Sequence, residues 1–148
     1  MKIKIFVSAV LLCILFSCKK QDSPKTNCDK TVASIAGTYS LVKFEVGTNG
    51  AFQDATSELE ACGLDDKISL NKDGSTVTQD LGTVCSPPDN SRGSWSISPS
   101  GQITINDPNP GPIDISTADI TSFDCSTLVL TASDPNSPGT QFRLTMKK

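Results

Sequence analysis

The sequence of 148 residues fits one ordinary domain with a modest core. It contains 13 Lys and Arg against 16 Asp and Glu, a formal net charge of −3, which argues against a phosphate-binding surface and hence against nucleic acid as a partner. Histidine is absent, so imidazole-based catalytic triads and histidine metal sites are excluded.

The first segment has the pattern of a bacterial secretion signal. Two lysines precede an uncharged, mostly apolar run from Ile5 to Phe16, and the sequence turns polar directly after Cys18. This run is well short of the roughly 20 residues that cross a bilayer, so we do not expect a transmembrane anchor. Its ending, LFSC, resembles the bacterial lipobox, in which a cysteine receives lipid and becomes the mature N-terminus. We predict a lipoprotein signal peptide at residues 1–17 and a lipid on Cys18, with an ordinary secretory signal as the alternative.

The segment that follows, residues 18–34, is polar, contains a proline and lacks a hydrophobic period, which predicts a flexible tether. Loss of the signal peptide also removes Lys2 and Lys4, and the formal net charge then changes from −3 to −5. An acidic protein is disfavoured at anionic lipid head groups. We therefore expect membrane contact through the lipid on Cys18 and not through a basic surface.

The third segment, residues 35–148, shows β-type alternation of apolar and polar residues between clusters of Gly, Pro, Asn and Asp. In Gln102–Asn106, for example, every second side chain is apolar. Antiparallel strands of this kind bury one face, which a short chain achieves as a closed barrel or as a two-sheet sandwich. The eight predicted strands are Gly37–Val46, Asp66–Asn71, Ser75–Leu81, Gly93–Ser98, Gln102–Asn106, Ile113–Phe123, Thr127–Ala132 and Thr140–Lys147.

The lengths of the connections favour the barrel. In an up-and-down barrel successive connections fall alternately at the two ends. Connections two, four and six are tight turns, whereas one, three, five and seven are longer, so one end is closed and the other is a mouth with long loops. The predicted fold class is all-β, an eight-stranded antiparallel up-and-down barrel. The long connections lie near residues 47–65, 82–92, 107–112 and 133–139.

Besides Cys18, four cysteines remain after processing, and an exported compartment permits disulfides. Cys62 and Cys85 lie in the first and third connections, at the mouth, while Cys28 and Cys125 lie at the closed end. Any other pairing has to cross a barrel about 17 to 24 Å tall, whereas bonded cysteines have Cα atoms within about 7 Å. We predict the pairs Cys62–Cys85 and Cys28–Cys125. A four-cysteine zinc site is the alternative, disfavoured because no CxxC spacing occurs.

Several short segments resemble the lipocalin-like lipoproteins of Bacteroidetes over roughly residues 34–148. They are Gly37–Leu41, Cys62, Asp65–Ile68, Asp73–Ser75, Cys85 and Gly93–Ile97. The family usually has Trp where this sequence has Tyr39. The resemblance implies a lipocalin-like barrel on a lipid anchor at the periplasmic or outer face of the outer membrane, and it supplies no catalytic residues.

Two groups of acidic residues are candidates for metal binding or catalysis. Residues 69–80 superficially match a calcium loop, but their flanks alternate as strands and a hairpin turn is the better interpretation. The first connection carries carboxylates of the type used in glycoside hydrolysis, which we interpret as solvated acids beside a short helical turn capped by Thr56 or Ser57 with Glu60. These carboxylates are Asp54, Glu58, Glu60, Asp65 and Asp66. We predict no catalytic residue, cofactor or metal.

The predicted function is noncatalytic binding of a small apolar or amphipathic ligand at the mouth, with the first connection as a lid and the surface around Trp95 and Phe142 in contact with the ligand. The alternative is a cell-envelope interaction module whose long loops contact a protein or a glycan around a packed core. The chain is expected to be a monomer. The predicted inward-facing residues are Phe44, Ile68, Leu70, Val77, Trp95, Ile97, Ile103, Ile105, Leu128, Leu130, Phe142 and Leu144.

Overall fold

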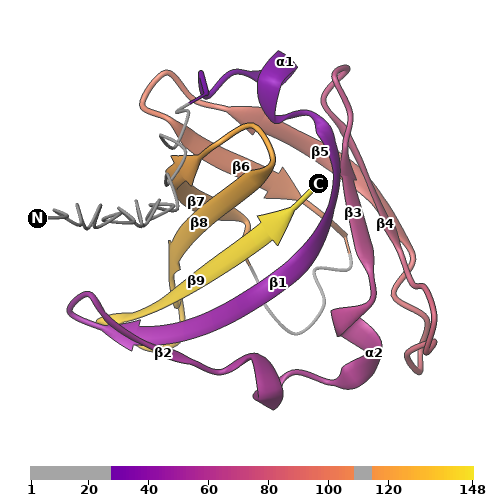
Figure 1. The fold of residues 1–148 in the computed structure, drawn as a ribbon, viewed down its shortest axis with the longest axis vertical. Coiled ribbons are helices and arrows are strands. Elements are labelled where there is room, and N and C mark those ends of the chain that lie inside the picture. The colour runs from indigo at the N-terminus through magenta and orange to yellow at the C-terminus, as the bar shows by residue number, and fades with distance from the viewer. Residues whose placement is uncertain (1–27, 109–114) are drawn as a thin grey trace, which may run out of the picture.

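A computed structural model describes residues 28–108 and 115–148 of the chain. The predicted signal peptide, Cys18 and the tether up to residue 27 lie outside these residues. In chain order the elements are α1 (Val32–Ile35), β1 (Gly37–Thr48), β2 (Ala51–Asp54), η1 (Thr56–Glu58), α2 (Ala61–Leu64), β3 (Lys67–Leu70), β4 (Ser75–Gln79), β5 (Ser91–Ile97), β6 (Gln102–Asn106), β7 (Thr117–Phe123), β8 (Thr127–Ser133) and β9 (Thr140–Lys147) (Figure 1). Within the described part, no helix has the length and apolar character needed to cross a membrane.

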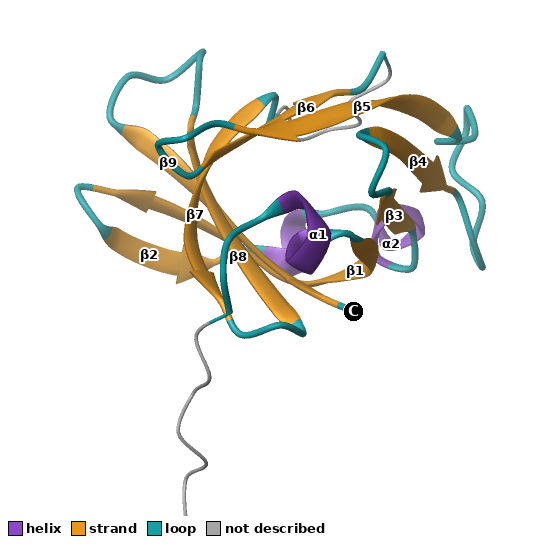
Figure 2. Cartoon of the chain, turned by 90° about the horizontal axis from the view of Figure 1, so that it is seen from above, coloured by secondary structure: helices purple, strands orange, loops and turns teal. Residues whose placement is uncertain are grey.

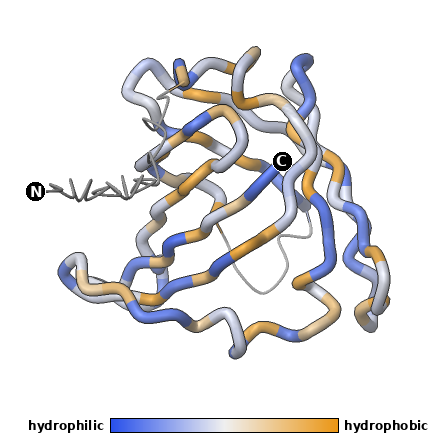
Figure 3. Tube along the Cα trace, in the orientation of Figure 1, coloured by the Kyte–Doolittle hydropathy of each residue, from blue (hydrophilic) through white to orange (hydrophobic). Residues whose placement is uncertain are grey.

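The strands form one closed antiparallel barrel. From β3 to β9 each strand pairs with the next, and β1 pairs with both β3 and β9. Apolar and polar residues alternate along β1 and β9, as the hydropathy colouring shows (Figure 3). The predicted fold, an eight-stranded up-and-down barrel, is confirmed, because the predicted strands correspond to β1 and β3–β9.

Strand β2 was not predicted as a strand. It lies within the first long connection. It forms a hairpin with the end of β1, in which Thr48 pairs with Ala51 and Glu45 with Asp54. Strand β3 pairs with the same edge of β1 but only near its beginning, at Gly37–Ser40. A gap in the pairing of β1 therefore lies between β3 and β2. The loop fills it: the amide of Phe44 donates to the Thr56 hydroxyl at 2.9 Å, and its carbonyl accepts from the amide of Ala55 at 2.9 Å.

The closed end of the barrel carries the tight turns at residues 71–74, 98–101 and 124–126 together with α1. Figure 2 views the barrel from this end and shows α1 across its opening. Thr31 and Ser34 form a capping box that starts α1, and Ile35 at its end is fully buried in the barrel. The Cys28–Cys125 disulfide, with Cα atoms 5.4 Å apart, joins the segment before α1 to the β7–β8 turn.

The mouth, at the opposite end, carries β2, η1, α2 and the longer connections (Figure 1). Strands β4 and β7 are shorter here than predicted, whereas β1 and β5 each extend two residues further toward the mouth, to Thr48 and Ser91. Strand β4 ends at Gln79 and not at Leu81, because the Asp80 carboxylate accepts hydrogen bonds from the amides of Cys85 and Asp89 and so organises a loop. Strand β7 begins at Thr117, later than the predicted Ile113, which lies outside the described residues.

Candidate functional site

A cavity of about 600 Å³ opens inside the barrel at the mouth. Its walls come from strands β1, β3, β6 and β9, and the segment from Leu59 to Gly63 covers one side. Most of the lining is apolar, as expected of a site that takes an apolar guest. The apolar lining residues are Tyr39, Leu41, Leu59, Ile68, Ile105, Pro108, Ile115, Leu144 and Met146.

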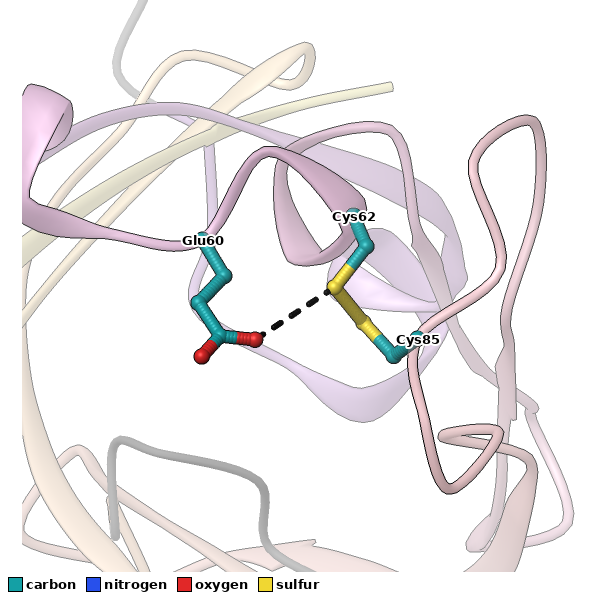
Figure 4. A group of neighbouring side chains, drawn as sticks. All are labelled: Glu60, Cys62 and Cys85. Carbon is teal, nitrogen blue, oxygen red and sulfur yellow. Dashed lines mark hydrogen bonds between the residues drawn. A yellow bond between two sulfur atoms is a disulfide. The ribbon is translucent and has the colours of Figure 1, made fainter.

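In the first connection, where a lid was predicted, the residues that line the cavity are Leu59, Glu60 and, from α2, Cys62 and Gly63. The Cys62–Cys85 disulfide, with Cα atoms 5.2 Å apart, joins α2 to the β4–β5 connection, and both cysteines line the cavity. The Glu60 carboxylate lies 3.7 Å from Cys62 Sγ (Figure 4). This is a packing contact, since a disulfide sulfur has no proton to donate. The predicted helical turn exists as η1, but its N-cap is Ala55, and neither Thr56 nor Ser57 caps it.

The two disulfides of the structure are the pairs that the loop lengths predict, Cys28–Cys125 and Cys62–Cys85. One fastens each end of the barrel. Stable disulfides are typical of proteins outside the reducing cytoplasm, so they indicate an extracytoplasmic protein.

Carboxylates stand at the opening of this apolar cavity. Four lining residues are acidic, namely Glu60, Asp66, Asp89 and Asp107. Asp107 accepts hydrogen bonds from the hydroxyls of Thr78 and Ser91, at 3.1 and 2.6 Å. Asp66 accepts one from the amide of Leu81 at 3.1 Å. These bonds hold the carboxylates at defined positions in the wall.

The environment of Asp66 and Asp89 disfavours their negative charge. Burial raises the pKa of Asp66, and the neighbouring charges of Asp80, Asp89 and Asp65 raise it further, against the opposing hydrogen bond from Leu81. Burial likewise raises the pKa of Asp89, with further contributions from Asp107 and Asp80. The mouth therefore concentrates negative charge in a partly desolvated place.

Tyr39 contributes a neutral polar group to the deepest part of the site. Its side chain is fully buried, and its hydroxyl donates to the Ile35 carbonyl of α1. Burial raises the pKa of Tyr39 well above its ordinary value, so the phenol keeps its proton. Tyr39 thus links the floor of the cavity to the helix that closes the other end.

Of the twelve residues predicted to face inward, three line the cavity: Ile68, Ile105 and Leu144. Most of the others belong to the packed core toward the closed end. Trp95 is part of it, since its indole N–H donates to the Asn71 carbonyl in the β3–β4 turn at 2.8 Å. From the predicted set, this core contains Leu70, Trp95, Ile97, Ile103, Leu128 and Leu130, and Ile105 belongs both to it and to the cavity wall.

The remaining predicted residues lie elsewhere. Phe44 and Phe142 pack against each other in a second cluster, with ring centroids 5.7 Å apart, and neither lines the cavity. The predicted ligand contact around Trp95 and Phe142 is therefore corrected, because both side chains are used in packing. Val77 is also corrected: Thr76 is buried and Thr78 lines the cavity, so the alternation of β4 places Val77 on the outer face.

Several lining residues were missing from the predicted set. Tyr39 and Leu41 face inward, as Phe44 does, although the spacing from Leu41 to Phe44 is odd. The register between β1 and β9 shifts between Leu41 and Lys43, so a bulge at Val42 changes the phase of the strand. Met146 follows the regular alternation of β9 and could have been found from it.

The acidic and sulfur-containing groups do not assemble into a thiolate metal site in the described part of the chain. Asp66, Asp80 and Cys85 lie close together, as do Glu60, Cys62 and Cys85. Both cysteines are bonded to each other, however, and offer no thiolate. The calcium-like segment 69–80 is the β3–β4 hairpin, in which Asp73 accepts hydrogen bonds from the amide and hydroxyl of Ser75.

The fold places the carboxylates that resemble those of glycoside hydrolases at different sites. Glu60 and Asp66 line the cavity, whereas the carboxylate of Asp54 accepts from the amide of Thr56 and shapes the start of η1. Asp65 accepts from the amide of Thr83 in the β4–β5 connection. Asp54 and Asp65 thus hold loops, whereas Glu60 and Asp66 belong to the cavity lining.

Comparison with known families gives one match. A sequence model of the lipocalin-like domain matches residues 35–130, which is more than half of the chain and extends from the end of α1 into β8. No curated protein matches the chain.

Proposed function

This chain belongs to the lipocalin-like domain family, and on that premise we propose that it binds one small apolar or amphipathic molecule in the cavity at the mouth, without transforming it. The observation that carries the proposal is the cavity itself. Its volume of about 600 Å³ lies within the range of roughly 300 to 1,000 Å³ that is usual for small-molecule sites.

The walls of the cavity supply the driving force for such binding. An apolar guest that loses contact with water there gains about 0.8 kcal/mol for each buried CH₂ group. The closed end is blocked by α1 and by the packed core around Ile35, so a guest enters from the mouth. This geometry supports a site that is open on one side.

The alternative function, a loop-mediated interaction module, requires a barrel filled by its own side chains. The closed half meets that requirement, but the half toward the mouth does not. The cavity exceeds the roughly 300 Å³ at which a void begins to favour a ligand. We therefore prefer the binding function.

The test is native mass spectrometry of the protein purified from its own host, which we expect to carry a retained small molecule. Ile68→Trp would narrow the cavity and should reduce retention. Val77→Trp is the matched control, since it places the same side chain on the neighbouring strand but on the outer face. Retention that is unaffected by Ile68→Trp in a folded protein would contradict the proposal.

We also propose that the mature protein is anchored by lipid on Cys18 at the outer membrane, facing either the periplasm or the exterior. The lipobox-like LFSC sequence and the two disulfides support this. We expect Cys18→Ser to abolish incorporation of labelled fatty acid and to release the protein from the membrane fraction. Unchanged labelling of this variant would contradict the anchor.

A further inference from the structure

The acidic residues at the cavity opening are brought together from separate parts of the chain. Glu60 precedes α2, Asp66 precedes β3, Asp89 lies in the β4–β5 connection and Asp107 follows β6. We call these four residues the acidic rim. Barrel closure places all four around one opening, although Asp66 and Asp107 are 41 positions apart in the sequence.

Acidic side chains outnumber basic ones by four to one in the described lining of the cavity. Lys67 is the only basic residue among the described lining. It is exposed and follows Asp66 directly in β3, so the alternation of the strand turns its side chain to the outer face. On the outer wall, Lys43 and Arg143 are paired with Glu45, at 2.8 and 2.6 Å.

The basic groups of the closed end are also engaged away from the mouth. Lys148 donates to the Ser34 carbonyl, and Lys30 donates to the Ile120 carbonyl. The charges that act on Asp66 are those of Asp80, Asp89 and Asp65, all of them negative.

The negative charges that produce the electrostatic field at the mouth are held in position in the ligand-free protein. Asp65 is held by the amide of Thr83, and Asp80 by the amides of Cys85 and Asp89. Charges that are held in a partly desolvated cleft act more strongly on a ligand than mobile charges in water. A cation at this position would relieve the mutual repulsion of the carboxylates, whereas an anion would increase it.

We propose that the ligand of this cavity is an amphipathic amine, whose apolar body lies against the barrel wall and whose ammonium group lies at the acidic rim. This inference rests on the proposed function and specifies its ligand class. The apolar lining favours an organic cation over a bare metal ion, because a metal ion would leave that surface unfilled. Fatty acids and other amphiphiles with an anionic head are disfavoured.

The experiment compares three probes with one apolar chain and different head groups: decylamine, decanol and decanoate. Isothermal titration calorimetry at neutral pH and low salt measures their affinities for the mature protein. We expect decylamine to bind at least about tenfold more tightly than decanoate, with decanol between them. The preference should shrink as the salt concentration rises, because ions screen an opening exposed to solvent.

A pair of charge-neutralising variants locates the effect. Asp66→Asn removes one charge of the acidic rim, while the amide oxygen can still accept from Leu81. Asp119→Asn is the control, since Asp119 is exposed on β7 and bonded to Gln102 across the sheet, away from the cavity. We expect Asp66→Asn to weaken decylamine about fivefold, with decanol unchanged, and Asp119→Asn to change neither.

The outcomes separate this inference from the proposed function. Equal affinity for the three probes, or a preference for decanoate, overturns the amine and leaves a general apolar site. An equal loss of decylamine affinity in Asp66→Asn and Asp119→Asn also overturns it, because the effect would then follow net charge alone. Binding of none of the probes contradicts both.

Discussion

The two ends of this barrel are built from the same strands but have opposite physical characters. Toward the closed end, Leu70, Ile103 and Leu128 are at most 1% exposed and pack with α1 against the tight turns. Toward the mouth, the same β3 strand continues into Ile68 and Asp66, which border a cavity. Stability is therefore concentrated in one half and binding in the other. A barrel of this kind can change its ligand without endangering its fold.

The largest effects on stability at the two ends are expected from the disulfides. Cys28–Cys125 closes a sequence separation of 97 residues and Cys62–Cys85 one of 23. In the chain-entropy model, these correspond to about 4.7 and 3.4 kcal/mol of stability. Replacing both members of each pair by Ala should lower the free energy of unfolding by roughly these amounts, measured in urea. A greater loss for the pair at the mouth would contradict the comparison.

Truncation of the packed core should come next in size. Leu128→Ala removes a fully buried side chain and should cost about 3 kcal/mol, because the cavity left behind cannot collapse. Ile68→Ala enlarges an opening that already exists and should cost about 1 kcal/mol. Urea titrations followed by Trp95 fluorescence can measure both variants. Equal losses would show that the two halves are equally tight.

Acid should act on the outer wall through Glu45. Hydrogen bonds from Arg143 and Lys43 lower the pKa of Glu45 from 4.5 to about 2. Because the carboxylate is favoured in the folded state, its contribution is complete above about pH 4.5 and is lost as the pH falls toward 2. We expect the wild type to lose about 1 kcal/mol in this range relative to Glu45→Gln, since the pair partners are partly exposed. Parallel pH curves of the two proteins would contradict this assignment.

The mouth should show the smallest effect, with the opposite sign. The pKa of Asp66 is raised, so its ionisation opposes folding, and this cost disappears as the pH falls and the carboxyl is protonated. Asp66→Asn should therefore be more stable than the wild type by about 0.5 kcal/mol at neutral pH, with the difference vanishing in acid. Thermal unfolding across the pH range can measure it. A destabilised Asp66→Asn protein would mean that the acidic rim supports the fold.

The alternation of residues together with the lengths of the connections was sufficient to predict the barrel, but not to distinguish its packed half from its hollow half. Trp95 and Ile105 are cross-strand neighbours with the same inward direction, yet one is packed beneath a turn and the other lines the cavity. An apolar side chain facing inward gives the same signal in both cases.

Two local features were beyond the reach of the pattern. The inward positions of β4 are threonines, so the apolar Val77 indicated the wrong face of that strand. The bulge at Val42 shifts the pairing register of β1, and no residue type in the sequence indicates it. The disulfide pairs were predictable, because loop length alone assigned each cysteine to an end.

The loop after β2 bonds to β1 at Phe44, and this attachment affects the rate of ligand exchange. The segment that covers one side of the cavity is held three residues before its start by Thr56, which bonds the backbone of Phe44, and near its end by the Cys62 disulfide. A cover held at two points does not have to swing open and close again with each binding event. We therefore expect association to be fast and to proceed in a single kinetic phase, with residence time set by the ligand's own contacts. Reduction of the mouth disulfide would release one attachment and should introduce a slow phase.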